Sequence, residues 1–161
     1  MTNAESFFRL VRHPLKFRLF LLTKLPSAWF SGVRVKEIDE THCQVSVPYK
    51  WFSQNPFRST YFACLAMAGE LSTGALAMAN VYKSNPAVSM LVVDMHAEYH
   101  KKAVGKTFFT CRDGLLFREM INDAILTGES RTVQATSIGT NTAGELIATF
   151  RISWSFRARR S

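Results

Sequence analysis

Glu70 is the residue of this sequence with the clearest chemical potential. It is the only charged residue between Arg58 and Lys83, in a run rich in Ala, Leu and Met. That composition favours a helix, and the small residues on every side of it predict a helix that is buried all round. A carboxylate in such a place pairs with a cation, takes up a proton or lies in a polar cleft. Glu70 is therefore a candidate general base or nucleophile, with a structural carboxylate as the alternative.

Two further polar residues lie where they could assist a carboxylate. Asn55 lies in an irregular segment, 51–58, directly before a proline, and is either a turn residue or an amide that positions a ligand. Thr73 lies one turn after Glu70 and could bond the carboxylate or a nearby water, although a helical Thr commonly bonds its own backbone. His96 and His100 lack the neighbours of a Ser-His-Asp arrangement, so we interpret both as structural or surface residues.

The bulk composition limits the classes of protein to consider. The 161 residues suit one domain, 1–161, and the hydrophobic content of 47% is that of a folded protein. Three cysteines without Cys-x-x-Cys spacing predict no disulfide framework and no metal site, and favour a reducing, cytoplasmic location. The net charge of +8 favours anionic partners, such as nucleic acid, a membrane surface or a phosphate-bearing ligand.

The elements that must position Glu70 follow from hydrophobic periodicity. Residues 1–30 form an N-terminal helical extension with one or two basic amphipathic segments in 5–24, and Pro14 suits the first turn of the second. A strand begins at Val33 and Val35, and a hairpin turn at 39–42 precedes the next strand. The other predicted elements are a strand at 43–49, the buried helix at 59–80, strands at 88–99 and 107–112, a short helix at 114–126, and strands at 131–138 and 146–156.

This order predicts an α+β domain with a mostly antiparallel sheet, because strands and helices do not alternate as in βαβ units. The nearly continuous apolar run 88–99 predicts a central strand that is covered on both faces. The strand 146–156 alternates strictly between apolar and polar residues, which predicts one buried face. One long helix with small residues on every side fits a sheet of about six strands that wraps around it.

These features together resemble the hotdog fold, and in particular acyl-CoA thioesterases of the DUF4442 branch near the PaaI-like enzymes. The resemblance covers roughly residues 30–157. It is carried by the loop amide Asn55, by the helix start at 59–64, by Glu70 and by the turn 99–105, which reads Tyr-His-Lys-Lys-Ala-Val-Gly. One departure is clear: where many members have His-Gly-Gly eight residues before the carboxylate, this sequence has Tyr-Phe-Ala at 61–63.

The resemblance implies hydrolysis of a thioester. Glu70 would act as base or nucleophile, and the backbone N–H of Phe62 would hold the oxyanion. Asn55 would position the water or the carbonyl group, and Thr73 would bond the water or the carboxylate. The family's active site lies between two subunits, so the resemblance also implies a homodimer or a homotetramer.

The same resemblance implies a binding site for an acyl-CoA or another acyl thioester. Tyr61 and Phe57, with Phe52 and Phe62, would line an acyl tunnel. The phosphates of coenzyme A, which enters as part of the substrate and not as a cofactor, would bind Arg58, Lys101, Lys102 and Lys106.

Two alternatives stay open from the sequence. The missing His-Gly-Gly favours a non-catalytic protein of the same fold that binds a fatty acyl group or acyl-CoA. The charge and the N-terminal segment favour a protein of a membrane surface or of nucleic acid, although no nucleic-acid-binding motif is present. For residues 5–24 we favour a helix laid on the domain over a peripheral membrane anchor, because surface helices with one apolar face are ordinary.

Overall fold

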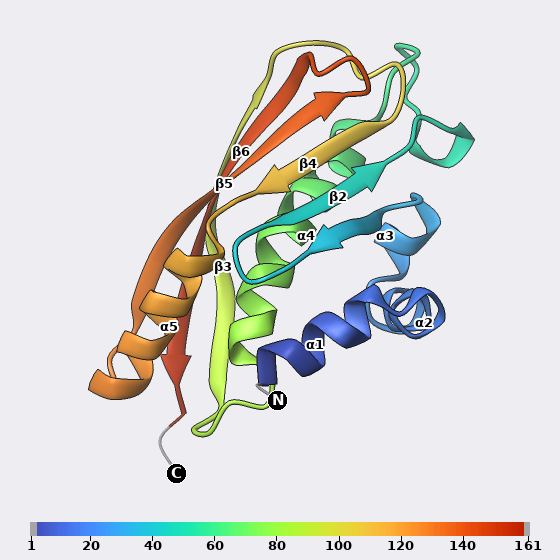
Figure 1. Cartoon of the computed structure of the whole chain (residues 1–161). Coiled ribbons are helices and arrows are strands. Elements are labelled where there is room, and N and C mark those ends of the chain that lie inside the picture. The colour runs from blue at the N-terminus through green and yellow to red at the C-terminus, as the bar shows by residue number, and fades with distance from the viewer. Residues whose placement is uncertain (1–2, 160–161) are drawn as a thin grey trace.

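The computed structural model describes residues 3–159 and contains one antiparallel six-stranded sheet, which confirms the expected α+β class. Figure 1 shows the sheet curling around one long helix, α4. The elements in chain order are α1 (Asn3–Arg12), α2 (Pro14–Lys24), α3 (Pro26–Phe30), β1 (Arg34–Ile38), β2 (Cys43–Val47), a 3-10 turn η1 (Trp51–Ser53), α4 (Phe62–Val81), β3 (Val88–Tyr99), β4 (Thr107–Cys111), α5 (Gly114–Thr127), β5 (Arg131–Asn141) and β6 (Leu146–Ala158).

The helix α4 is the centre of the fold, as its composition predicted. Twelve of its 20 residues are buried. Among the described residues it is also the one helix long and apolar enough to cross a membrane, but 67% of its apolar window is buried inside the domain. The prediction placed its start three residues too early, because Thr60 and Tyr61 are held in extended backbone by N–H bonds of 2.8 Å to the carbonyls of Ala103 and Ser53. The helix therefore begins at Phe62.

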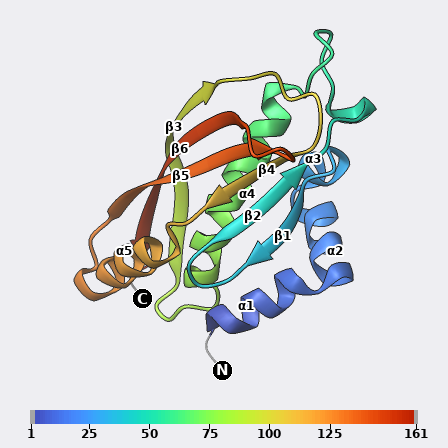
Figure 2. The ribbon, with the colours of Figure 1, turned by 45° about the horizontal axis from the view of Figure 1, so that its top comes forward.

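Both α4 and α5 lie against the same face of the sheet. The strand order is β1-β2-β4-β5-β6-β3, and every second residue of β6 from Ala148 is buried. Phe150 of β6 packs on α4, where a Cβ at Gly69 would lie 2.7 Å from its ring. Phe156, on the same face of β6, meets Phe117 of α5 at 5.9 Å between ring centroids. The alternation predicted for this strand is confirmed. Figure 2 shows α4 within the curve of the sheet and α5 near the ends of β5 and β6.

The prediction of a central strand at 88–99 is wrong in its position. β3 has the predicted bounds, but it is the last strand at one edge and pairs only with β6. Its side chains are exposed or half-buried throughout, including Leu91, Val93 and Met95. The sequence of β3 is apolar as described, but within one chain the other elements cover only one edge of the strand and part of one face.

The range 5–24 holds two helices, α1 and α2, with Pro14 in the first turn of the second as predicted, and a third short helix, α3, follows. Phe7 of α1 packs on Tyr82 just after α4, with 5.4 Å between ring centroids, and Arg12 donates 2.6 Å and 3.1 Å bonds to the carbonyl of Ile38. Phe17 and Leu21 of α2 are buried. These contacts lay the helices against α4 and the β1 edge of the sheet, as the favoured interpretation of 5–24 required.

Candidate active site

A cavity of about 740 Å³ opens where the loop 54–60, the start of α4 and the turn after β3 meet. Thr60 joins these parts, because its N–H and its hydroxyl both donate to the carbonyl of Ala103, at 2.8 Å and 3.1 Å. Six of the residues predicted for a site line the cavity, namely Asn55, Phe57, Tyr61, Phe62, Lys101 and Lys102. The sequence-predicted loop and turn therefore face one another across a common hollow.

The N-terminus of α4 forms one wall of this cavity. Tyr61 is the residue that precedes the helix, and its side chain makes no capping hydrogen bond. The first N–H groups of a helix have no partner inside the helix, and they carry its positive end. Phe62, which lines the cavity, thus presents a backbone donor at its edge, and Ala63 follows it in the same first turn. A carbonyl oxygen that gains negative charge is stabilised by such donors.

Asn55 organises the loop that forms the opposite wall. Its Oδ1 accepts hydrogen bonds from the backbone N–H groups of Phe57 and Ser59, at 3.0 Å and 3.2 Å, and from the Ser59 hydroxyl at 3.1 Å. Its Nδ2 donates to the carbonyl of Thr60 at 3.4 Å. The side-chain oxygen is therefore committed to the loop, and the second N–H of the amide is the part that can still contact a ligand.

An aromatic wall extends from the cavity into the core, and the sequence alone did not identify all of it. The ring centroids of Phe62 and Tyr99 lie 6.4 Å apart, and those of Tyr99 and Phe150 lie 5.8 Å apart. Burial raises the pKa of the Tyr99 hydroxyl. The inward alternation of β6 could have indicated Phe150, but the position of Tyr99 depends on the pairing of two strands distant in the chain.

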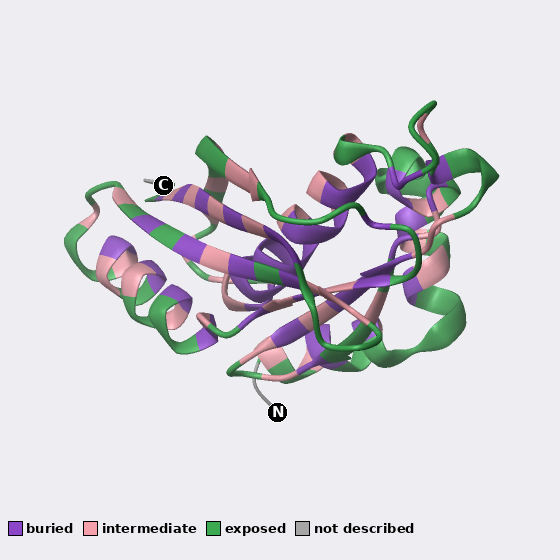
Figure 3. Ribbon diagram, turned by 90° about the horizontal axis from the view of Figure 1, so that it is seen from above, coloured by how far each residue is buried: buried purple, intermediate pink, exposed green. Residues whose placement is uncertain are grey.

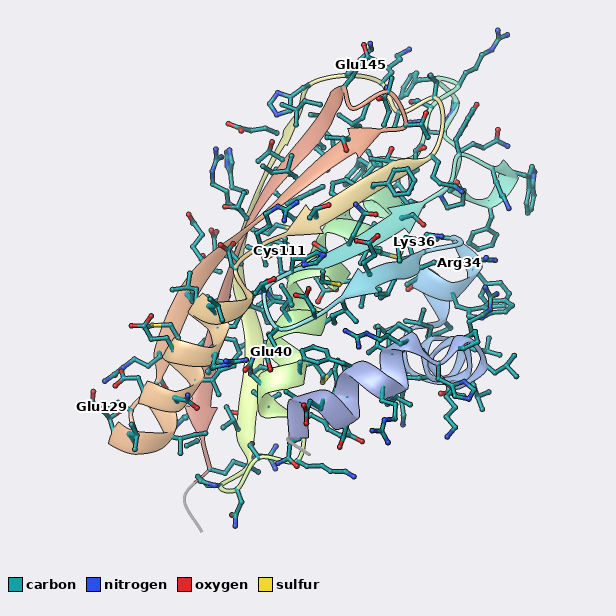
Figure 4. All side chains as sticks on the ribbon, viewed as in Figure 1. Arg34, Lys36, Glu40, Cys111, Glu129 and Glu145 are labelled. Atoms are coloured by element: carbon teal, nitrogen blue, oxygen red, sulfur yellow. The ribbon has the colours of Figure 1, made fainter. Side chains whose placement is uncertain are left out.

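The basic residues predicted for phosphate binding divide into three cases. Lys101 forms an ion pair at 2.5 Å with Glu145, which lies in the β5–β6 hairpin and is labelled in Figure 4. Lys102 crosses the cavity mouth, where its Nζ donates to the carbonyl of Phe57 at 3.4 Å. Arg58, which has a positive φ of 58°, and Lys106 are exposed and do not line the cavity.

Glu70 lies farther along α4, outside this cavity. No residue in the range 3–159 gives its half-buried carboxylate a hydrogen bond or an ion pair, and burial raises its pKa. A Cβ at Gly74 would lie 3.0 Å from Glu70 Oε1 and 3.2 Å from the ring of Trp154. The carboxylate therefore lies over a glycine beside an indole, in a setting that favours the protonated form relative to an exposed Glu.

Thr73 is buried beside Glu70, but its hydroxyl is directed elsewhere. Its Oγ1 donates to the backbone carbonyl of Glu70 at 2.9 Å and accepts from Trp154 Nε1 at 2.9 Å. The first bond stays within α4, and the second anchors α4 to β6. The structure thus pairs Thr73 with the indole of Trp154, a partner that sequence reasoning missed.

The predicted residues consequently form two groups. Phe62 and Glu70 are eight positions apart, which on an α-helix is roughly 12 Å along the axis. The cavity group contains Asn55 and Phe62, and the second group contains Glu70 and Thr73. Within a single chain the helix start and the carboxylate do not face one common water-sized space.

Comparison with protein families gives one match over most of the chain. The model of a domain of unknown function, DUF4442, matches residues 15–156. A search of the curated proteins found no match.

Solved structures show the same fold at low sequence identity. A Pseudomonas aeruginosa protein of unknown function, called a probable thioesterase, is 19% identical with a TM-score of 0.72, and the match covers 96% of this chain and 95% of that one. A protein of unknown function from Chlorobaculum tepidum is 13% identical with a TM-score of 0.76, and the match covers 97% and 94% of the two chains. A thioesterase from Haemophilus influenzae is 9% identical with a TM-score of 0.60, with 89% of each chain covered. The hotdog fold expected from the sequence is thereby confirmed.

Proposed function

The chain belongs to the DUF4442 family, and from this premise we propose that it is a thioesterase that hydrolyses an acyl-CoA or a related acyl thioester. The observation that carries the proposal is the uncapped start of α4, which opens into a cavity of about 740 Å³ lined with aromatic residues. Thioesterases are named among the solved structures of the same fold. The unpartnered Glu70 supplies the second requirement, a group that can activate water or attack the carbonyl carbon.

The proposed reaction uses these groups in two roles. The thioester carbonyl lies against the start of α4, where the N–H of Phe62 bonds its oxygen. As a base, Glu70 takes a proton from water while the water oxygen bonds the carbonyl carbon; the carbon–sulfur bond then breaks, the thiolate leaves with that proton, and the acid product forms. As a nucleophile, the Glu70 carboxylate bonds the carbonyl carbon, the carbon–sulfur bond breaks to leave an acyl–Glu70 anhydride, and water then hydrolyses the anhydride to the acid and restores Glu70. A helix N-terminus stabilises the oxyanion through charge that is already oriented.

The distance between Phe62 and Glu70 leads us to propose a homodimer with composite sites. At roughly 12 Å apart on one helix, the two groups of one chain do not reach the same carbonyl. A second copy whose α4 runs in the opposite direction would bring its Glu70 to the cavity. The apolar edge strand β3, with Leu91 at 65% exposure and Val93 at 52%, is the surface on which we place this second copy.

Mixing two inactive variants tests this arrangement. Glu70→Gln keeps the cavity, and Phe62→Pro keeps the carboxylate, so a mixed dimer contains one complete site if each site draws on both chains. After unfolding and refolding together, an equal mixture then regains about a quarter of the wild-type sites. A mixture that stays inactive while forming dimers contradicts the composite site.

The cavity also suggests how the substrate lies. The acyl chain follows the wall formed by Phe62 and Tyr99, and the phosphates of coenzyme A lie at the mouth, near Lys101 and Lys102. Lys102 meets only a carbonyl oxygen at 3.4 Å, so a phosphate can take its place. We place the reaction in the cytoplasm, which the three buried free cysteines favour.

A thiol-release assay over acyl-CoAs of graded chain length tests the proposed function. The wild type is expected to release coenzyme A from some of them, and Glu70→Gln is expected to lose that activity while keeping its circular dichroism spectrum. Thr73→Ser is the matched control on the same helix, because it keeps the hydroxyl that bonds Trp154. A folded wild type without turnover on any acyl-CoA or acyl carrier protein thioester refutes the proposal.

A non-catalytic acyl-binding protein is the second candidate. Two observations favour it: the oxygen of Asn55 is committed to its own loop, and Tyr-Phe-Ala stands at 61–63 in place of the family's His-Gly-Gly. Calorimetry against acyl-CoAs and free fatty acids separates the candidates, because this alternative requires binding without turnover.

A further inference from the structure

The outer face of α2 carries a stripe of exposed leucines. With about 100° of rotation per residue, Leu15, Leu19 and Leu22 lie on one side of the helix, roughly opposite the buried Phe17 and Leu21. Leu15 is 74% exposed and Leu19 is 62% exposed. Figure 3 shows exposed ribbon at the right edge of the molecule, where α2 lies in Figure 1. The helix is therefore apolar on two faces, and the domain covers only one of them.

A chain of aromatic contacts joins this helix to η1. The Arg18 guanidinium lies 5.6 Å from the ring of Trp29, which meets Phe30 at 4.9 Å. Phe30 in turn lies 5.8 Å from Phe52. Trp51 then follows Phe52 at 6.2 Å and is 81% exposed. We call the exposed set the leucine–aromatic patch, and its members are Leu15, Leu19, Leu22, Phe30, Trp51 and Phe52.

Basic charges predominate around the patch. From Ser6 to Lys36 the sequence has seven basic residues and no acidic one, and from 41 to 69 it has Lys50 and Arg58 and no acidic one. On α2, Lys16 and Arg18 flank the leucine stripe on its two sides. Arg34 and Lys36 lie on β1, beside α2, as Figure 4 shows. They line a cavity of about 570 Å³ between α2 and β1, together with Arg12 and Arg18 and with the acidic Glu37 and Asp39.

We propose that the leucine–aromatic patch docks the protein on an anionic membrane surface. Leucine and tryptophan side chains insert at the boundary of headgroups and acyl chains, and lysine and arginine beside them bind anionic lipid headgroups. The patch combines both features on one face.

Two other occupants fit the patch less well. A second copy of the chain would bring two basic faces together, and like charges at an interface are unfavourable. The apolar edge that suits a second copy is β3, at the far side of α4. A nucleic acid would use the charges but would leave the leucine stripe exposed to water, because aliphatic side chains neither stack on bases nor bond phosphates.

Docking through this patch has a geometric consequence for the cavity. Trp51 and Phe52 lead directly into the loop 54–60, which forms one wall of the 740 Å³ cavity. The cavity mouth is thereby held close to the membrane, where long-chain acyl compounds collect. The docking itself does not depend on the proposed hydrolysis, because lipid binding can be measured on any folded variant.

Co-sedimentation of the full chain with vesicles tests the inference. We expect binding to vesicles of phosphatidylcholine mixed with phosphatidylserine, weaker binding to phosphatidylcholine alone, and a decrease as salt is raised. Replacing Leu15 and Leu19 together by Ser should lower the partition coefficient about tenfold or more. Lys16→Glu should lower it about fivefold or more on the anionic vesicles. Trp51 fluorescence should shift to the blue on binding, and Trp51→Phe should remove that shift.

Matched controls lie on the opposite side of the molecule. Leu126 on α5 is 85% exposed, so Leu126→Ser removes an equally exposed leucine, and Arg157→Glu reverses an exposed charge on β6. Both should bind vesicles like the wild type. The inference is overturned if the folded wild type stays in the supernatant, or if the Leu15 and Leu19 variant binds as well as the wild type. It is also overturned if that variant changes only the oligomeric state, or if the protein is retained by DNA but not by vesicles.

Discussion

Phe62→Pro isolates a single backbone N–H group at the start of α4. Proline is favoured at the first position of a helix, where its fixed φ suits the helix and its missing N–H has no intrahelical partner. The residue before proline must be extended, and Tyr61 already is, with φ −60° and ψ 133°. The Phe62 side chain is 55% exposed, so its loss removes little from the core. The substitution should therefore change the free energy of unfolding by less than about 1 kcal/mol.

The expected effect on catalysis is large by comparison. Removing one oxyanion donor typically lowers kcat about 100- to 1000-fold, which is about 2.7–4 kcal/mol of transition-state stabilisation. Phe62→Ala is the matched control, because it removes the same ring from the aromatic wall and keeps the N–H. We expect Phe62→Ala to change mainly KM, and Phe62→Pro to lower kcat as well.

The assay is thiol release at saturating acyl-CoA, with thermal unfolding of both variants followed by circular dichroism. The reasoning is refuted if Phe62→Pro is folded and its kcat equals that of Phe62→Ala. In that case the donor lies elsewhere, and the N–H of Ala63 is the next group to remove.

Two further predictions concern stability. Burial raises the pKa of Glu70 above its ordinary value of 4.5, so the folded protein keeps this proton to a higher pH than the unfolded chain does. As pH rises from 4.5 toward the pKa of the folded state, Glu70 therefore destabilises the fold increasingly. Glu70→Gln should therefore raise the melting temperature at neutral pH and leave it nearly unchanged below pH 4.5; a lower melting temperature at neutral pH would reveal a stabilising partner for the carboxylate. Thr73→Val leaves the buried Nε1–H of Trp154 without an acceptor and should cost about 1–3 kcal/mol in urea unfolding, whereas Thr73→Ser keeps the acceptor and should cost less; a loss in Thr73→Val no larger than in Thr73→Ser would show that the bond to Trp154 contributes little.

The elements that the sequence predicted well are those whose hydrophobic pattern is set by residues close together in the chain. The small residues around Glu70 identified the buried helix, and the alternation of 146–156 identified a strand with one buried face. The strand predicted at 43–49 ends at Val47 instead, where the proline at 48 removes an N–H donor. The strand predicted at 131–138 continues to Asn141, because hairpin pairing extends it past the apolar run.

β3 shows where such patterns reach their limit. A run that is apolar on both faces predicts that both faces of the strand are buried. The pattern does not tell whether the same chain or a second chain covers them. The same holds for the site. Glu70 could be recognised from its lone charge, whereas the Thr73–Trp154 bond joins residues 81 positions apart and follows only from the packing of α4 on β6.

The position of β3 also has a consequence during synthesis. β3 pairs with β6 alone, and Val88 lies opposite Ala158 in that pairing. On the ribosome, the helix α4 and the strand β3 emerge before β4, β5 and β6 exist. Closing contacts over such long stretches of chain is slow, and an unpaired apolar strand associates readily with other chains. Segment 62–99 of the nascent protein must therefore stay apart from other chains until segment 146–158 has been synthesised.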